Sequence, residues 1–224
     1  IIEKYLYLRQ GLHYKISLKF VTLILVVSTA KNYKMNDNLI QDILKYVSLT
    51  ESDIATLSKY TEQIDYKKKE YVLKENSFCR HLFFVEKGCL RMYFINDKAV
   101  EQIVQFAIDG WWISDLKSFN NNTPSDYYIQ TVENSRVALI NTDNLDQLLN
   151  ELPKLERYFR IIMQKGFAAA QLKAKLMYEM SKENFYNHFC SSFPEFVQRV
   201  PQYMIASYLG LTPEYVSELR KKKL

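Results

Sequence analysis

Cysteine is scarce in this sequence, with Cys79, Cys89 and Cys190 the only ones among 224 residues. An odd number of cysteines without a CxxC spacing argues against a disulfide framework and against a zinc site. Free thiols are typical of a reducing compartment, so the sequence predicts a cytoplasmic protein.

Long hydrophobic runs are also missing. The apolar run at 20–27 is too short to span a bilayer, so no membrane partner is expected. Basic residues precede this run and small residues follow it, which gives residues 1–34 the look of a signal peptide. Secretion would conflict with the nucleic-acid-binding features described below. We therefore interpret residues 1–34 as an extension that is not part of the fold, with Met35 as the true start.

Charge of one sign is in slight excess. The composition is 48% hydrophobic and 25% charged, as in globular proteins, and the formal net charge is +5. The tail from Arg199 onward is the most one-sided part, with five basic and two acidic residues. This balance permits nucleic acid as a partner without requiring it.

The middle of the chain alternates between apolar and polar residues. Helical spacing at 36–60 gives way to short stretches of period two, separated by turn residues such as Lys87-Gly88 and Asn96-Asp97. Several short strands at this spacing predict a β-roll of the jelly-roll type between helices, and therefore an α+β fold. The strands are expected at 64–67, 71–73, 81–86, 89–95, 99–107, 127–131 and 136–141.

A long helix is predicted after Pro153, since no strong breaker precedes Met180. Such a helix would be roughly 40 Å long, which is more than one small domain needs. Its length favours pairing with the same helix of a second copy, although its apolar face could instead pack on its own chain. The predicted dimer interface consists of Leu155, Phe159, Ile162, Gly166, Ala169, Leu172, Leu176 and Met180.

Two short helical patterns flank a turn at 209–211. Gly210 can take the positive φ that a tight turn requires, and Thr212 is placed as the N-cap of the second helix, before Pro213. Val216 and Leu219 would be buried. This pattern is typical of a helix-turn-helix, whose second helix enters the major groove of DNA. The alternative is an ordinary helical hairpin that closes a domain.

A β-roll, a long helix and a terminal helix-turn-helix in this order resemble the Crp/Fnr family of bacterial transcription regulators. The stretch LFFVEKGCLR at 82–91 is similar to the family's strand-turn-strand, and IASYLGLTPEYVS at 205–217 to its shorter, Bacteroidetes-type members. The resemblance implies a cyclic-nucleotide-binding-type β-roll domain at 35–152, a dimerisation helix at 153–181 and a helix-turn-helix domain at 182–224. We expect no β-hairpin wing. It also implies a homodimer that binds double-stranded DNA, with RNA polymerase as a further partner.

The sequence departs from this family where cyclic AMP would bind. Members that bind it use a glutamate for the ribose and an arginine for the phosphate. Here the segment that matches the glutamate reads Ser114-Asp115-Leu116. The segment that matches the arginine, Ser125-Asp126-Tyr127, contains no arginine. We predict no cyclic nucleotide binding, while another small-molecule effector, of unknown identity, stays possible. Its candidate pocket residues are Trp111, Trp112, Ser114, Asp115, Ser125, Asp126 and Tyr127, of which the aromatic ones suit core packing better.

Other cofactors of the family do not fit either, and no cofactor is predicted. An iron–sulfur sensor needs about four cysteine ligands. Cys79 and His81 are candidates for a haem ligand, but a lone histidine on a strand is usually structural. No metal site is expected.

The second helix of the helix-turn-helix also departs from the pattern. Many relatives have an arginine after the serine that matches Ser217, and it reads guanine. Glu218 stands at that position here, and it should weaken DNA binding or alter the base that is read. Glu214 can accept a hydrogen bond from a cytosine amino group. The predicted DNA-binding residues are Thr212, Glu214, Tyr215, Ser217, Glu218, Arg220, Lys221 and Lys222.

Two other functions stay open beside a DNA-binding regulator. A cupin-type metal enzyme would need clustered ligands, typically two histidines and a carboxylate. His13, His81 and His188 lie in three different segments, so the sequence predicts that the protein is not an enzyme. The other alternative is a sensory or adaptor dimer that has lost sequence-specific DNA binding.

Overall fold

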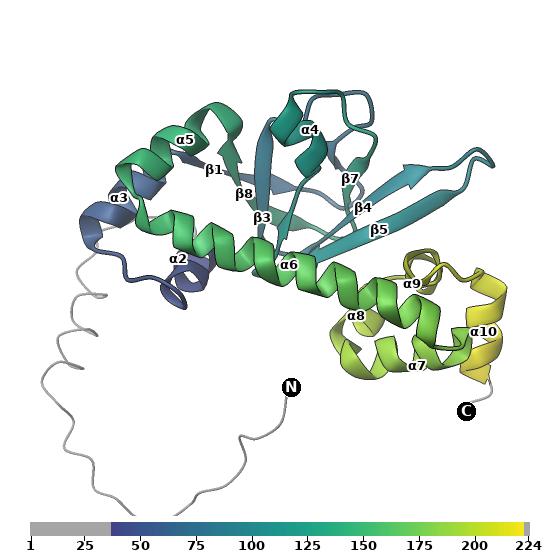
Figure 1. Cartoon of the computed structure of the whole chain (residues 1–224). Coiled ribbons are helices and arrows are strands. Elements are labelled where there is room, and N and C mark those ends of the chain that lie inside the picture. The colour runs from purple at the N-terminus through teal and green to yellow at the C-terminus, as the bar shows by residue number, and fades with distance from the viewer. Residues whose placement is uncertain (1–36, 222–224) are drawn as a thin grey trace, which may run out of the picture. The chain divides into compact units, whose positions relative to one another are not determined.

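A computed structural model describes residues 37–221 of the chain, so the predictions for residues 1–34 and for Lys222 lie outside its described part. Figure 1 shows two β-sheets, the long helix α6 and a group of short C-terminal helices. The helices are α2 (Asp37–Leu44), α3 (Glu51–Lys59), α4 (Leu116–Asn121), α5 (Thr142–Glu151), α6 (Lys154–Glu179), α7 (Lys182–Ser192), α8 (Pro194–Arg199), α9 (Gln202–Leu209) and α10 (Pro213–Lys221). The strands are β1 (Thr61–Tyr66), β2 (Tyr71–Leu73), β3 (His81–Lys87), β4 (Cys89–Ile95), β5 (Glu101–Ile108), β6 (Trp112–Ile113), β7 (Tyr128–Thr131) and β8 (Ser135–Asn141).

The strands form two four-stranded sheets, in the orders β1-β8-β3-β6 and β2-β7-β4-β5. Side chains from both sheets, such as Leu90, Ile129 and Val137, are fully buried in one shared cluster. This arrangement confirms the predicted α+β fold with a β-roll. The sequence missed β6, α4 and α8, because each is too short to show a period.

The long helix α6 is anchored to the roll by its first turns. Leu155 and Tyr158 are fully buried there. The Tyr158 hydroxyl donates a hydrogen bond to Asp42 Oδ2 on α2 at 2.7 Å and accepts one from Trp112 Nε1 at 2.8 Å. One tyrosine thus joins α6 to α2 and to strand β6.

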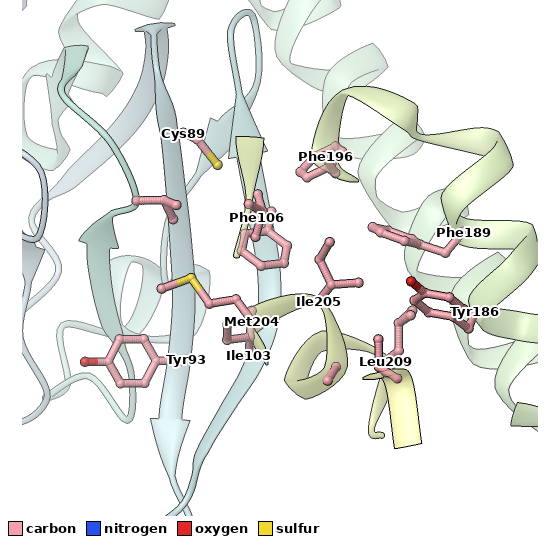
Figure 2. Close-up of a cluster of buried hydrophobic side chains, with 14 of the residues drawn as sticks. Cys89, Tyr93, Ile103, Phe106, Tyr186, Phe189, Phe196, Met204, Ile205 and Leu209 are labelled. Atoms are coloured by element: carbon pink, nitrogen blue, oxygen red, sulfur yellow. The ribbon is translucent and has the colours of Figure 1, made fainter. Parts of the chain in front are cut away.

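The short C-terminal helices share a hydrophobic core with the second sheet. Figure 2 shows Ile103 and Phe106 of β5 beside Phe189, Phe196 and Ile205 of the helices. The contact is also polar, because Ser207 Oγ on α9 donates to the Glu101 carbonyl at 2.7 Å and accepts from Ile103 N at 3.0 Å. The helical group and the roll therefore form one packed unit.

Gly88 closes the turn between β3 and β4 with a φ of +113°. A Cβ at this position would lie 2.2 Å from Ser135 Oγ and 2.7 Å from Ser135 Cα, which is far inside contact distance. We expect Gly88→Ala to lower the free energy of unfolding by at least about 2 kcal/mol, because it adds a clash to backbone strain. Urea denaturation measures this loss.

Gly110 provides the matched control for this substitution. Its φ is also positive, at +83°, but an added Cβ would meet no atom within 4 Å. Gly110→Ala should therefore cost about 1 kcal/mol from the backbone alone. Equal losses in the two variants would show that the clash with Ser135 contributes nothing.

Candidate nucleic-acid interface and effector region

Helices α9 and α10 are joined by a tight turn in which each end is capped. Gly210 has a φ of +68° and ends α9 in the left-handed conformation. The Leu211 amide donates to the Ala206 carbonyl at 2.9 Å. Thr212 Oγ1 accepts a hydrogen bond from Tyr215 N at 3.2 Å, as an N-cap does. The positive φ of Gly210 and the N-cap at Thr212, which the sequence predicted, are both present.

Helix α10 buries one side and exposes the other. Val216 is fully buried and Leu219 is 3% exposed, and both belong to the core shared with the sheet. Tyr215 is half-buried and packs against the same core, so it is poorly placed for base contact. The other described members of the predicted DNA-binding set are exposed: Thr212, Glu214, Ser217, Glu218, Arg220 and Lys221.

The outward stripe of α10 follows the helical spacing i, i+3, i+4, i+7. It contains Glu214, Ser217, Glu218 and Lys221, opposite the buried pair. Two carboxylates and one ammonium group give this stripe a net negative charge. Arg220 lies at its edge, where Nη1 donates to Gln202 Oε1 on α9 at 3.0 Å.

Asp115, expected at the effector site, has a structural task. It is 3% exposed, and Oδ1 accepts hydrogen bonds from Lys117 N at 3.0 Å and Ser118 N at 3.2 Å as the N-cap of α4. Its other oxygen, Oδ2, accepts from the buried Ser125 hydroxyl at 2.8 Å. The structure thus brings Asp115 and Ser125 together, but their hydrogen-bonding groups are already satisfied by each other and by α4.

The remaining candidates for the effector site point to different neighbours. Trp111 packs on Phe196 of α8, while Trp112 packs on Phe84 and donates to Tyr158. Ser114 Oγ donates to the His81 carbonyl at 2.5 Å, and the exposed Asp126 pairs with Lys117. Tyr127 lies edge-on to Phe94. These residues do not converge on one pocket, and the aromatic ones take part in packing.

Cys79 and His81 lie close together without forming a ligand set. Burial raises the pKa of the Cys79 thiol, and burial lowers the pKa of His81. Within residues 37–221 no group of three or more His, Cys, Asp or Glu side chains is placed to hold a metal ion. None of the described helices is long and apolar enough to cross a membrane.

The predicted dimer stripe on α6 is divided between two environments. Leu155 is buried, and Phe159, Ile162, Leu176 and Met180 pack against the chain's own core clusters. Gly166, Ala169 and Leu172 are exposed. Most of this stripe therefore packs within its own chain, which was the alternative that the sequence left open.

A second apolar stripe on α6 faces away from the chain's own core. Its side chains are spaced 4, 3, 4 and 3 residues apart, as the a and d positions of a coiled coil are. All of them are exposed, and Phe167 has 67% of its surface accessible. The stripe consists of Met163, Phe167, Ala170, Ala174 and Met177.

Two cations lie between the roll and the helical group, and sequence reasoning missed both roles. Arg199 binds Glu133, Asp109 and Glu195. Lys173 of α6 lies with Nζ 3.5 Å from the centre of the Tyr208 ring, and burial lowers its pKa to about 8. Neither residue belongs to a local motif, so no sequence signal marked it.

Comparison with known proteins finds matches to the β-roll and to a longer part of the chain. Residues 63–151 match the model of the cyclic nucleotide-binding domain. The chain is 25% identical to the regulatory protein HlyX of Actinobacillus pleuropneumoniae over 186 residues, which covers 77% of this chain and 76% of that protein.

Solved structures share the fold at low sequence identity. The c-di-GMP responsive global regulator CLP of Xanthomonas campestris superposes with a TM-score of 0.64 at 15% identity, covering 77% of this chain and 91% of CLP. A transcriptional regulator from Eubacterium rectale gives a TM-score of 0.59 at 15% identity, covering 78% of this chain and 83% of that one.

Proposed function

This chain belongs to the Crp/Fnr family of regulators, and from that premise we propose that it is a homodimeric transcription regulator that binds double-stranded DNA through α10. The observation that carries the proposal is the capped α9–α10 pair. Its second helix buries Val216 and Leu219 and presents the opposite stripe, from Glu214 to Lys221, to the outside.

The dimer in this proposal forms through the exposed stripe of α6. A row of apolar side chains with coiled-coil spacing is costly to leave in water, and pairing with the same stripe of a second copy buries it. Two-fold symmetry then presents two α10 helices to the two halves of a palindromic site. RNA polymerase is the further partner expected of such a regulator in the cytoplasm.

Cyclic AMP is not the effector in this proposal. In members that bind cyclic AMP an arginine pairs with the phosphate, whereas the matching segment here, Ser125-Asp126-Tyr127, has none. A phosphate there would meet the Asp126 carboxylate, and the neighbouring Lys117 ammonium group is already paired with that carboxylate at 2.7 Å. Adding cyclic AMP should therefore leave DNA binding unchanged.

Arg220→Ala tests the proposal in a binding selection with the full chain and a pool of randomised duplexes. We expect the unchanged protein to enrich a palindromic site and the variant to bind that site at least about tenfold more weakly, because one phosphate contact is lost. A plot of the logarithm of the binding constant against the logarithm of the salt concentration should also become shallower. Its slope should change by about one for each α10 helix that carries the substitution.

Gln202→Ala is the control for that test, since it removes the same hydrogen bond from Arg220 to α9 and keeps the cation. It should bind nearly as well as the unchanged protein. Weak binding that no sequence in the pool improves would contradict a sequence-specific regulator. That result would favour the sensory or adaptor dimer, which the negative charge of the outward α10 stripe supports.

A further inference from the structure

A cavity of about 300 Å³ lies between the β-roll and the start of α9. The roll contributes Lys68 and Lys69 from the turn after β1, and Arg91 and Glu101 from β4 and β5. Tyr203 and Met204 of α9 close the other side. Neither Asp115 nor any other residue of the effector site predicted from the sequence lines this cavity. Its size suits a small metabolite.

The walls of this cavity are positive. The charged residues that line it are three cations, Lys68, Lys69 and Arg91, and a single carboxylate, that of Glu101. Helix α9 begins here at Pro201 without a side-chain cap, so its first backbone N–H groups add partial positive charge. A cationic cavity with an aromatic and a thioether side chain on one wall fits a small organic anion.

Arg91 is the buried end of this cavity, with 5% of its surface exposed. Its guanidinium donates to Gln130 Oε1 at 2.7 Å and to Glu101 Oε2 at 2.5 Å, and it lies over the Tyr93 ring. The Glu101 side chain is 43% exposed, so it can turn outward at little cost. An incoming anion can then take its place on the guanidinium fork.

Glu101 also connects the cavity to the DNA-binding helices. Its carbonyl oxygen accepts the hydrogen bond from Ser207 of α9, and that same hydroxyl accepts from Ile103 N. A change in the conformation of Glu101 therefore acts on the contact that holds α9 against β5.

We propose that this cavity is an effector site for a small phosphate- or carboxylate-bearing metabolite. The anion binds Arg91 together with Lys68 and Lys69, displaces the Glu101 carboxylate and loosens the contact between β5 and α9. Binding of the anion does not depend on the proposed DNA-binding function, because all of the groups that recognise it belong to the free protein.

Isothermal titration of the full chain with pyrophosphate, and separately with succinate, tests the site without DNA. We expect saturable binding of at least one probe, and the stronger probe distinguishes a phosphate from a carboxylate ligand. The double variant Lys68→Gln/Lys69→Gln should weaken that binding at least about tenfold, since two charge-assisted contacts are lost. The control Lys59→Gln/Lys98→Gln removes the same charge from exposed lysines that do not line the cavity, and it should bind as the unchanged protein does.

Hydrogen exchange tests the coupling to α9 in the same samples. Saturation with the stronger probe should speed the exchange of the amides of residues 202–209. Three results would overturn the proposal. No saturable heat from either probe, or equal weakening in both double variants, excludes the site. Binding without any change in the exchange of α9 excludes its role as an effector site.

Discussion

Phe167→Glu is expected to prevent the proposed dimer from forming and to leave the protein monomeric. Phe167 is the largest side chain of the exposed α6 stripe, and 67% of its surface is accessible within one protomer, so its replacement does not disturb the chain's own core. In the proposed dimer the substitution places one carboxylate from each protomer in an apolar interface. Burying two like charges there should weaken dimerisation by at least about a thousandfold. Sedimentation velocity across a range of concentrations measures this shift.

Leu172→Glu is the matched control, because it puts the same charge on the opposite side of the same helix. Leu172 is 54% exposed and belonged to the stripe that the sequence predicted. This variant should stay dimeric and bind DNA as the unchanged protein does, whereas Phe167→Glu should lose affinity for a palindromic site. The reverse pattern would return the interface to the predicted stripe.

The two stripes on α6 show where sequence reasoning reached its limit. Both repeat at three or four residues, and Phe159 and Phe167 are equally apolar. Periodicity places side chains on a common face of a helix, but it does not say what covers that face. The answer depends on Tyr158, whose bonds to Asp42 and Trp112 turn one side of α6 towards the roll. Those partners lie 116 and 46 residues away in the sequence.

Features with local causes were predicted well. Gly210 and Thr212 cap the ends of two helices through atoms that lie within a few residues of them. Glycine is needed at position 88 because the backbone there has a positive φ. The strands could be predicted because apolar and polar residues alternate along them, and their number and spacing predicted the β-roll. The outward side of α10 was predictable for the same reason, because two buried residues define the opposite face.

Roles set by distant partners were not predictable. Asp115 matched a ligand position in the family pattern, but it is the N-cap of α4, a helix too short to recognise in advance. The shared core of the roll and the helical group was also unexpected, since the sequence suggested separate domains. This core joins β5 to α9 over about a hundred residues, and only the folded chain shows which charges meet beside it.

Arg199→Ala is expected to cause the largest loss of stability among single substitutions in this contact region. Arg199 is 21% exposed, and it joins α8 to two loops of the roll. Its Nη2 lies 2.5 Å from Glu133 Oε1 and 2.8 Å from the Gly88 carbonyl, and its Nη1 lies 2.8 Å from Asp109 Oδ2. Burial disfavours the charged guanidinium, but the hydrogen bonds that it donates to Glu133, Asp109 and Glu195 outweigh this effect and raise the pKa of Arg199.

Removing this guanidinium takes away the cation that is hydrogen-bonded to all three carboxylates, and leaves only Lys68 and Lys87 as cations in the same hollow. We expect the free energy of unfolding in urea to fall by about 3 kcal/mol, which is the usual cost of breaking a partly buried network by removing one partner. Arg199→Lys keeps the charge but loses the planar fork, so it should recover part of the loss. Arg136→Ala removes an exposed arginine that pairs with Asp65, and its unfolding midpoint should hardly change.

The pH dependence of the variant separates repulsion from lost packing. If the loss comes from repulsion among the three carboxylates, neutralising them with acid relieves it. The loss of unfolding free energy in Arg199→Ala should then shrink as the pH falls from 7 towards about 4, where carboxyl side chains in model peptides become protonated. A deficit that stays constant over this range would assign the loss to the packing of the arginine stem against α8 and the roll, and not to its charge.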